Sequence, residues 1–219
     1  MRRELRITGD GSHTLYVPEL DEPYHSVHGS IQESRHVYIN EGFRKTSGDN
    51  LRILECGFGT GLNLLLTMEA ARTEVKKVFY HAVEKYPLAP EEYVHLNFGS
   101  LVAGLPPHTL TSIHDGPWNR PFIPGDSFTV FKELADFRNM APKGTFDLVY
   151  FDAFAPDKQP DLWSTKVFSK IFELMNPRAI LVTYTSKGSV RRTLSSCGFS
   201  VEKLPGPPGK REMIRASKR

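Results

Sequence analysis

The segment Leu51–Asn63 constrains the fold of this chain more than any other. A short apolar run ends in an acidic residue, Glu55, and a helical pattern follows over Leu62–Arg72. Between them the chain passes three glycines: Gly57, Gly59 and Gly61. Glycine allows a tight turn and lets bare backbone amides approach a ligand. The segment therefore predicts a buried strand that enters a helix through a ligand-binding turn, although a turn without a ligand gives the same pattern.

The glycine spacing and the acidic residue restrict the ligand. A dinucleotide-binding turn reads Gly-x-Gly-x-x-Gly, and a phosphate-binding P-loop ends in Gly-Lys-Ser/Thr, whereas this turn reads Gly-x-Gly-x-Gly without a lysine. Glu55 would also repel a pyrophosphate. A carboxylate beside the turn suits a ligand with a cationic end, such as the amino acid part of S-adenosylmethionine.

Strand and helix patterns alternate after residue 46, and the strand patterns are almost continuously apolar, as in strands covered on both faces. This predicts an α/β, Rossmann-like domain with a mostly parallel sheet and an antiparallel C-terminal hairpin. The expected strands are Arg52–Glu55, Val78–Val83, Ser127–Leu134, Phe146–Phe151, Ala179–Thr185, Ser200–Leu204 and Glu212–Ala216. The expected helices are Leu62–Arg72, Ala89–Asn97, Ser164–Leu174 and Ser189–Cys197, with Ser164 as an N-cap and Gly198 as a stop.

The chain of 219 residues is expected to hold one main domain, 47–219, preceded by a small β-rich extension, 1–46. Short strands are expected at Glu4–Thr8 and Thr14–Val17, followed by an amphipathic stretch, Ile31–Ile39. The segment Gly99–Gly125 is rich in Pro, Gly and His and reads as a long irregular insertion.

Acidic residues follow three successive strands. Glu84 lies 23 residues after Gly61, where an acid that binds ribose hydroxyls is expected. Asp136 follows the next strand and could accept a hydrogen bond from an adenine amino group. Ligands of open parallel sheets sit at the carboxyl ends of the strands. Together with Glu55, these residues outline an adenosyl ligand.

Asp152 emerges from another apolar strand into a loop that contains Phe154, Pro156 and Trp163. Proline and aromatic residues form a stiff, partly apolar rim around the carboxylate. Aromatic faces stack flat bases, and a carboxylate binds an amine. The loop therefore suits a base that carries an amine, although aromatic packing beneath a loop explains Trp163 better than Phe154.

Composition and charge narrow the class of protein. Hydrophobic residues make up 39% of the chain and charged residues 24%, as in ordinary globular proteins. We expect a cytoplasmic protein, because no signal peptide or membrane span is recognisable and Cys56 and Cys197 lack disulfide or metal spacing. The net charge is +3, yet residues 187–219 hold nine lysines and arginines against two glutamates. This basic segment could touch RNA or be a solvated face.

Five segments carry a resemblance to one known family. They are Glu55-Cys-Gly-Phe-Gly-Thr-Gly-Leu-Asn63, Glu84-Lys-Tyr-Pro-Leu88, Asp152-Ala-Phe-Ala-Pro-Asp-Lys-Gln-Pro-Asp-Leu-Trp163, Thr185-Ser-Lys-Gly-Ser-Val-Arg-Arg192 and Gly209-Lys-Arg-Glu-Met213. In this order they resemble the methyltransferase part of the bifunctional tRNA enzymes of the MnmC family. The opening segments Pro23–Gly29 and Glu33–Tyr38 resemble that family as well, whereas Gly99–Gly125 matches poorly.

The resemblance implies a class I, S-adenosylmethionine-dependent methyltransferase. It would convert 5-aminomethyluridine, often 2-thiolated, to 5-methylaminomethyluridine at the tRNA wobble position. No metal is required, and a separate oxidoreductase is a candidate partner. Asp152 is expected to be the catalytic residue. The cofactor-binding residues implied are Glu55, Gly57, Phe58, Gly59, Thr60, Gly61, Asn63, Glu84, Lys85 and Asp136. The implied tRNA-binding residues are Phe154, Pro156, Lys187, Arg191, Arg192, Lys210 and Arg211.

Two alternatives stay open. A methyltransferase of the same fold could act on a small amine or a protein side chain, and it would not need the basic segment. A non-catalytic RNA- or nucleotide-binding protein could also retain the scaffold, although the intact glycine turn and acidic residues argue against this.

Overall fold

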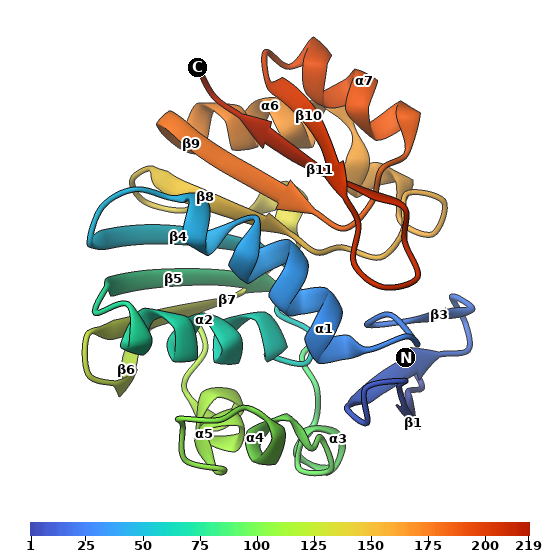
Figure 1. Ribbon diagram of the computed structural model, residues 1–219, viewed down its shortest axis with the longest axis vertical. Coiled ribbons are helices and arrows are strands. Elements are labelled where there is room, and N and C mark those ends of the chain that lie inside the picture. Colours follow the sequence, from blue (N-terminus) through green and yellow to red (C-terminus); the bar gives the residue numbers. More distant parts are fainter.

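The computed structural model describes residues 1–219 and contains two sheets. The central sheet has eight strands in the order β10-β11-β9-β8-β4-β5-β7-β6, and its five middle strands run parallel (Figure 1). This confirms the predicted Rossmann-like class. The strands are β4 (Asn50–Cys56), β5 (Lys77–Glu84), β6 (Pro121–Gly125), β7 (Phe128–Leu134), β8 (Phe146–Phe151), β9 (Met175–Thr183), β10 (Ser200–Pro205) and β11 (Glu212–Ser217).

Helical segments cover both faces of this sheet because its strands are apolar on both sides. Along β4, Leu51 and Ile53 pack into the cluster that includes α2, whereas Leu54 and Cys56 pack into the cluster beneath α6 and α7. The helical segments are α1 (Ser30–Ser34), η1 (Arg35–Asn40), η2 (Phe43–Lys45), α2 (Leu62–Thr73), α3 (Pro90–Tyr93), α4 (Phe98–Leu101), α5 (Thr109–Asp115), η3 (Phe137–Asn139), η4 (Pro160–Trp163), α6 (Thr165–Leu174) and α7 (Gly188–Ser196). None of them combines the length and apolar character needed to cross a bilayer.

Ser164 and Gly198 lie at helix ends as predicted, with one change of detail. Ser164 occupies the N-cap position of α6, but its hydroxyl donates to the Asp161 carbonyl instead of capping the helix. Gly198 follows α7 with a φ of 97°, a left-handed conformation that ends the helix.

The extension 1–46 is only partly β-rich. Strands β1 (Glu4–Ile7), β2 (His13–Val17) and β3 (Glu22–Pro23) form a separate antiparallel sheet, but residues 30–45 are mainly helical. Val37, Tyr38 and Phe43 are buried in the same cluster as α2. The helical half of the extension is therefore part of the main core.

The structure corrects the expectations for 89–125. The expected helix Ala89–Asn97 ends at Tyr93, and Asn97 is tied to the N-terminal hairpin, where its side chain accepts from the His13 amide and donates to the Gly11 carbonyl. The segment Gly99–Gly125 is not irregular, because it contributes α5 and the antiparallel edge strand β6. Its prolines and glycines suit an edge strand, which needs few backbone donors.

Candidate active site

A cavity of about 770 Å³ lies at the carboxyl ends of β4, β5, β7 and β8, where a parallel sheet binds its ligands. One wall consists of the glycine turn and the segments that follow β5 and β7. The opposite wall consists of residues 22–28, the loop after β8 and Lys210. Figure 1 shows the N-terminal sheet and the β10–β11 turn at the same end of the central sheet.

The glycine turn approaches its neighbours so closely that side chains are excluded. Gly57 has a φ of 88°, and a Cβ there would lie 2.6 Å from the carbonyl oxygen of Asp152. Gly59 has a φ of 50°, and a Cβ there would lie 3.0 Å from the ring of Tyr24. Both glycines line the cavity with bare backbone. A ligand can therefore approach the turn to within contact of its backbone.

Glu84 ends β5 with its carboxylate fixed at the cavity wall. One oxygen accepts the Gly59 amide at 3.0 Å, and the other accepts the Tyr86 amide at 2.7 Å. A carboxylate oxygen can accept more than one hydrogen bond. Glu84 can thus hold the turn and still accept two hydroxyl groups of a ribose.

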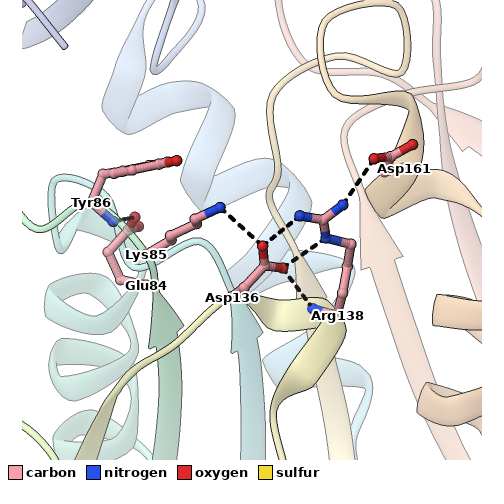
Figure 2. A network of polar contacts seen from close by, with 6 residues as sticks. All are labelled: Glu84, Lys85, Tyr86, Asp136, Arg138 and Asp161. Atoms are coloured by element: carbon pink, nitrogen blue, oxygen red, sulfur yellow. Dashed lines mark hydrogen bonds and ion pairs between the residues drawn. The ribbon is translucent and has the colours of Figure 1, made fainter.

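Asp136 belongs to an ion network at the same wall (Figure 2). Arg138 donates to both of its oxygens, at 2.9 and 2.6 Å, and Lys85 donates at 3.1 Å. The hydrogen bonds from Arg138 hold the pKa of Asp136 well below its usual range. The same arginine also binds Asp161 at 2.8 Å, so it joins this wall to the loop after β8. In this arrangement Lys85 helps to hold the carboxylate of Asp136 in the cavity wall.

Asp152 follows β8 and lines the cavity between the glycine turn and the opposite wall. Its Oδ2 accepts a hydrogen bond from Asn63 Nδ2 at 2.8 Å. Burial raises the pKa of Asp152 to about 6, although the nearby Tyr38 hydroxyl and the hydrogen bond from Asn63 oppose the shift. Asp152 is therefore a carboxylate near neutral pH and is basic enough to accept a proton.

Aromatic side chains form the rim near Asp152. The rings of Phe154 and Tyr24 meet edge to face, with centroids 5.0 Å apart. Trp163 is buried, and its indole N–H donates to the Phe154 carbonyl at 2.9 Å. The Tyr184 hydroxyl donates to the Ala153 carbonyl at 3.0 Å. Trp163 thus supports the loop from below, whereas Phe154 faces the cavity.

The structure places the predicted site residues in three groups. Those that line the cavity are Gly57, Phe58, Gly59, Thr60, Asn63, Glu84, Lys85, Asp136, Asp152, Phe154 and Lys210. Lys187 and Arg211 line a smaller hollow of about 250 Å³ that shares Lys210 and Tyr184 with the cavity. Glu55, Gly61, Pro156, Arg191 and Arg192 line neither space.

Two of these residues, Glu55 and Phe58, have buried side chains. Glu55 has no exposed surface and bonds to Asn63 at 3.1 Å, behind the cavity wall. The Phe58 ring packs against His114 and Trp118 of the 99–125 segment and is almost fully buried. Alternation along the strand accounts for Glu55, because residues 51, 53 and 55 all face α2.

Site residues that were not expected from the sequence come mainly from the extension. His25 Nε2 lies 2.6 Å from Thr60 Oγ1, and burial lowers the pKa of His25 to about 4, so the ring stays neutral. Glu22 accepts the Ala155 amide at 3.0 Å. Tyr24 and Arg138 complete the two walls. The only signal for the first of these residues was the resemblance of Pro23–Gly29 to the MnmC opening.

Comparison with known proteins identifies the class of enzyme. Residues 127–219 match the model of a family described as S-adenosyl-L-methionine-dependent methyltransferase. The chain is an S-adenosyl-L-methionine-dependent methyltransferase. S-adenosyl-L-methionine is its cofactor, and the bare turn with Glu84 fits the cofactor's size and polar groups.

Similarity over almost all of this chain supports the resemblance to MnmC. The methyltransferase is 32% identical over 225 residues to the tRNA 5-methylaminomethyl-2-thiouridine biosynthesis bifunctional protein MnmC of Cupriavidus metallidurans. The aligned region covers 96% of this chain and 33% of that protein. The chain thus spans about a third of the length of the curated relatives it matches.

Two solved structures resemble the methyltransferase. MNMC2 from Aquifex aeolicus superposes with a TM-score of 0.80 and 28% identity, over 99% of this chain and 70% of that one. Spermidine synthase from Thermotoga maritima gives a TM-score of 0.57 at 12% identity, over 100% of this chain and 72% of that one. The second likeness concerns the fold alone.

Proposed function

We propose that this methyltransferase converts 5-aminomethyluridine, with or without a 2-thio group, to 5-methylaminomethyluridine at the wobble position of tRNA. The curated relatives are named for the biosynthesis of tRNA 5-methylaminomethyl-2-thiouridine. The observation that carries the proposal is the position of Asp152, whose carboxylate lies between the glycine turn and the aromatic rim.

Each wall would hold one reactant. The cofactor supplies a methyl group on a positively charged sulfur. We assign the ribose to Glu84, the adenine end to the wall that holds Asp136, and the close approach of the amino acid part to the glycine turn. The uracil ring would stack against Phe154 and Tyr24, with its aminomethyl group toward Asp152.

Asp152 would orient the acceptor amine for in-line attack. The nitrogen lone pair forms the new N–C bond while the bond from carbon to sulfur breaks, and sulfur keeps that electron pair. The amine then loses a proton, either to Asp152 or to water. Only a neutral amine has the lone pair, so a nearby carboxylate that can take up a proton favours the reaction.

Basic side chains around the cavity would contact the anticodon region. Lys210, Lys187 and Arg211 lie at its edge, and Arg191 and Arg192 are exposed on α7. Lysine and arginine bind phosphates in a salt-dependent manner. Because the proposed substrate is tRNA, we also expect the protein to be located in the cytoplasm. We further propose that an oxidoreductase activity outside residues 1–219 supplies the aminomethyl group.

A nucleoside analysis tests the proposal. The protein is incubated with S-adenosyl-L-methionine and tRNA from cells that lack this modification, and the digested nucleosides are examined by mass spectrometry. We expect 5-aminomethyluridine to be replaced by a product heavier by one methylene. Methyl transfer to free amines or to protein, with tRNA left unmodified, would contradict the proposal.

A further inference from the structure

Glu55 differs from the other acidic residues at the strand ends because it has no access to the cavity. Its side chain has no exposed surface, and one oxygen accepts Asn63 Nδ2 at 3.1 Å. The other oxygen is buried without a hydrogen-bond partner. No lysine or arginine pairs with it, unlike Asp136. Ionisation of such a carboxyl group would be costly.

Asn63 connects Glu55 to Asp152. The same Nδ2 that donates to Glu55 donates at 2.8 Å to Asp152 Oδ2, so its two hydrogens serve two carboxyl groups. Strand alternation places all three on the α2 side of the sheet, since Glu55 pairs in register with Tyr150 and Asp152 lies two residues after that tyrosine. This is a continuous path from a buried acid to the proposed amine-binding carboxylate.

We propose that Glu55 is a neutral positioning residue that fixes the amide of Asn63, and through it the carboxylate of Asp152, instead of binding the cofactor. The inference rests on the proposed role of Asp152. Burial, and then the charge of Asp152, raise the pKa of Glu55 well above its usual range. The Tyr80 hydroxyl partly opposes this rise in the pKa of Glu55, although the two groups form no hydrogen bond of ordinary geometry.

Binding of S-adenosyl-L-methionine alone provides the first test, by calorimetry without tRNA. Because a neutral Glu55 makes no contact with the cofactor, Glu55→Gln should keep the dissociation constant within about two-fold. If Glu55 were instead a carboxylate paired with the cofactor's ammonium group, Glu55→Gln would weaken cofactor binding at least about ten-fold. A loss of that size would overturn the inference, whatever the acceptor proves to be.

Methyl transfer provides the second test, with a matched pair of variants. Glu55→Leu has similar volume but no acceptor for Asn63, so kcat should fall about ten-fold while cofactor affinity is retained. Glu55→Gln keeps an acceptor oxygen and should restore kcat to within about three-fold of the native value. Equal losses of kcat in both variants would contradict the positioning role. If Glu55→Leu does not fold, calorimetry with Glu55→Gln still decides the cofactor question.

The pH profile separates positioning from general packing. Asn63 lowers the pKa of Asp152, so loss of its orientation in Glu55→Leu should move the acid limb of kcat to higher pH. Glu55→Gln should leave the limb in place, whereas removal of an ionised Glu55 would move it to lower pH and contradict the inference. Other titratable groups also affect the pKa of Asp152 or have a pKa that the charge of Asp152 affects. They are Glu33, Tyr38, Cys56, Tyr80, Tyr184 and Lys210.

The protonation state can also be observed without catalysis. The infrared C=O stretch of a protonated carboxylic acid should be present at neutral pH in the native protein and absent in Glu55→Gln. This measurement remains valid if tRNA is not the substrate. An unchanged spectrum would contradict a neutral Glu55.

Discussion

The two walls of the cavity are built in different ways. The donor wall consists of the glycine turn, Glu84 and the Asp136 network, which all follow parallel strands that lie side by side in the sheet. The acceptor wall combines the loop after β8 with residues 22–28 and Lys210, which come from opposite ends of the chain. The fixed wall suits a cofactor, and the assembled wall can define an acceptor.

Contacts between distant segments hold the acceptor wall together. Lys210 forms an ion pair with Glu33, and its ammonium lies 4.0 Å from the centre of the Tyr184 ring. His36 bonds to the Pro205 carbonyl at 2.8 Å. These contacts join α1 and η1 to the C-terminal hairpin. We therefore expect substitutions in the donor wall to change cofactor binding and substitutions in the acceptor wall to change methyl transfer.

The largest effect is expected for Asp152→Ala. Loss of the carboxylate should lower kcat about 10³-fold, within the range for a group that accepts a proton, and leave the affinity for S-adenosyl-L-methionine within about two-fold. Steady-state kinetics and calorimetry measure the two quantities. Asp126→Ala, an exposed acid outside the cavity lining, is the control. Near-native turnover of Asp152→Ala would remove this residue from the mechanism.

The pH dependence should show the same separation. Burial raises the pKa of Asp152 to about 6, so its carboxylate form is present above this pH and is lost below it. We expect kcat to fall about ten-fold per pH unit below the pKa of Asp152. Cofactor affinity should stay level over this range, because Arg138 holds the pKa of Asp136 low. An acid limb that persists in Asp152→Ala would assign it to another group.

The donor wall is tested by Gly57→Ala. The added Cβ meets the Asp152 carbonyl oxygen at 2.6 Å, so the turn must shift and cofactor affinity should fall at least about ten-fold. Gly48→Ala is a matched control, because Gly48 has a similar φ of 95° but nothing within 4 Å of the added atom. Calorimetry that gave equal losses in both variants would show that backbone strain alone is responsible.

The smallest effect is expected at the basic surface. Arg191→Ala should weaken tRNA binding a few-fold and reduce the slope of log affinity against log salt by about one, as for a single phosphate contact. Lys77→Ala removes an exposed charge at the amino end of β5 and serves as the control. A binding assay at several salt concentrations provides both slopes. An unchanged slope for Arg191→Ala would exclude this residue from the interface.

The sequence predicted most of the sheet because its buried strands are apolar and continuous. The bounds of β8 were predicted as observed, and α2 differs by one residue at its end. The segment 99–125 was misread because the prolines and glycines of β6 resemble a loop until an edge position is available. The helices in the second half of the extension are too short to show the capping residues and apolar periodicity that indicate a helix in a sequence.

The sequence by itself determined the fold class and brought the glycine turn, Glu84 and Asp136 to one edge of the sheet. These depend on local spacing, since a strand, a glycine turn and the acid at the next strand end reach one edge of the sheet in any parallel arrangement. Only the tertiary structure decided the acceptor wall and the position of Glu55. Contacts such as Glu22 with Ala155 join residues far apart in the chain, and the burial of Glu55 depends on the helix that packs over it.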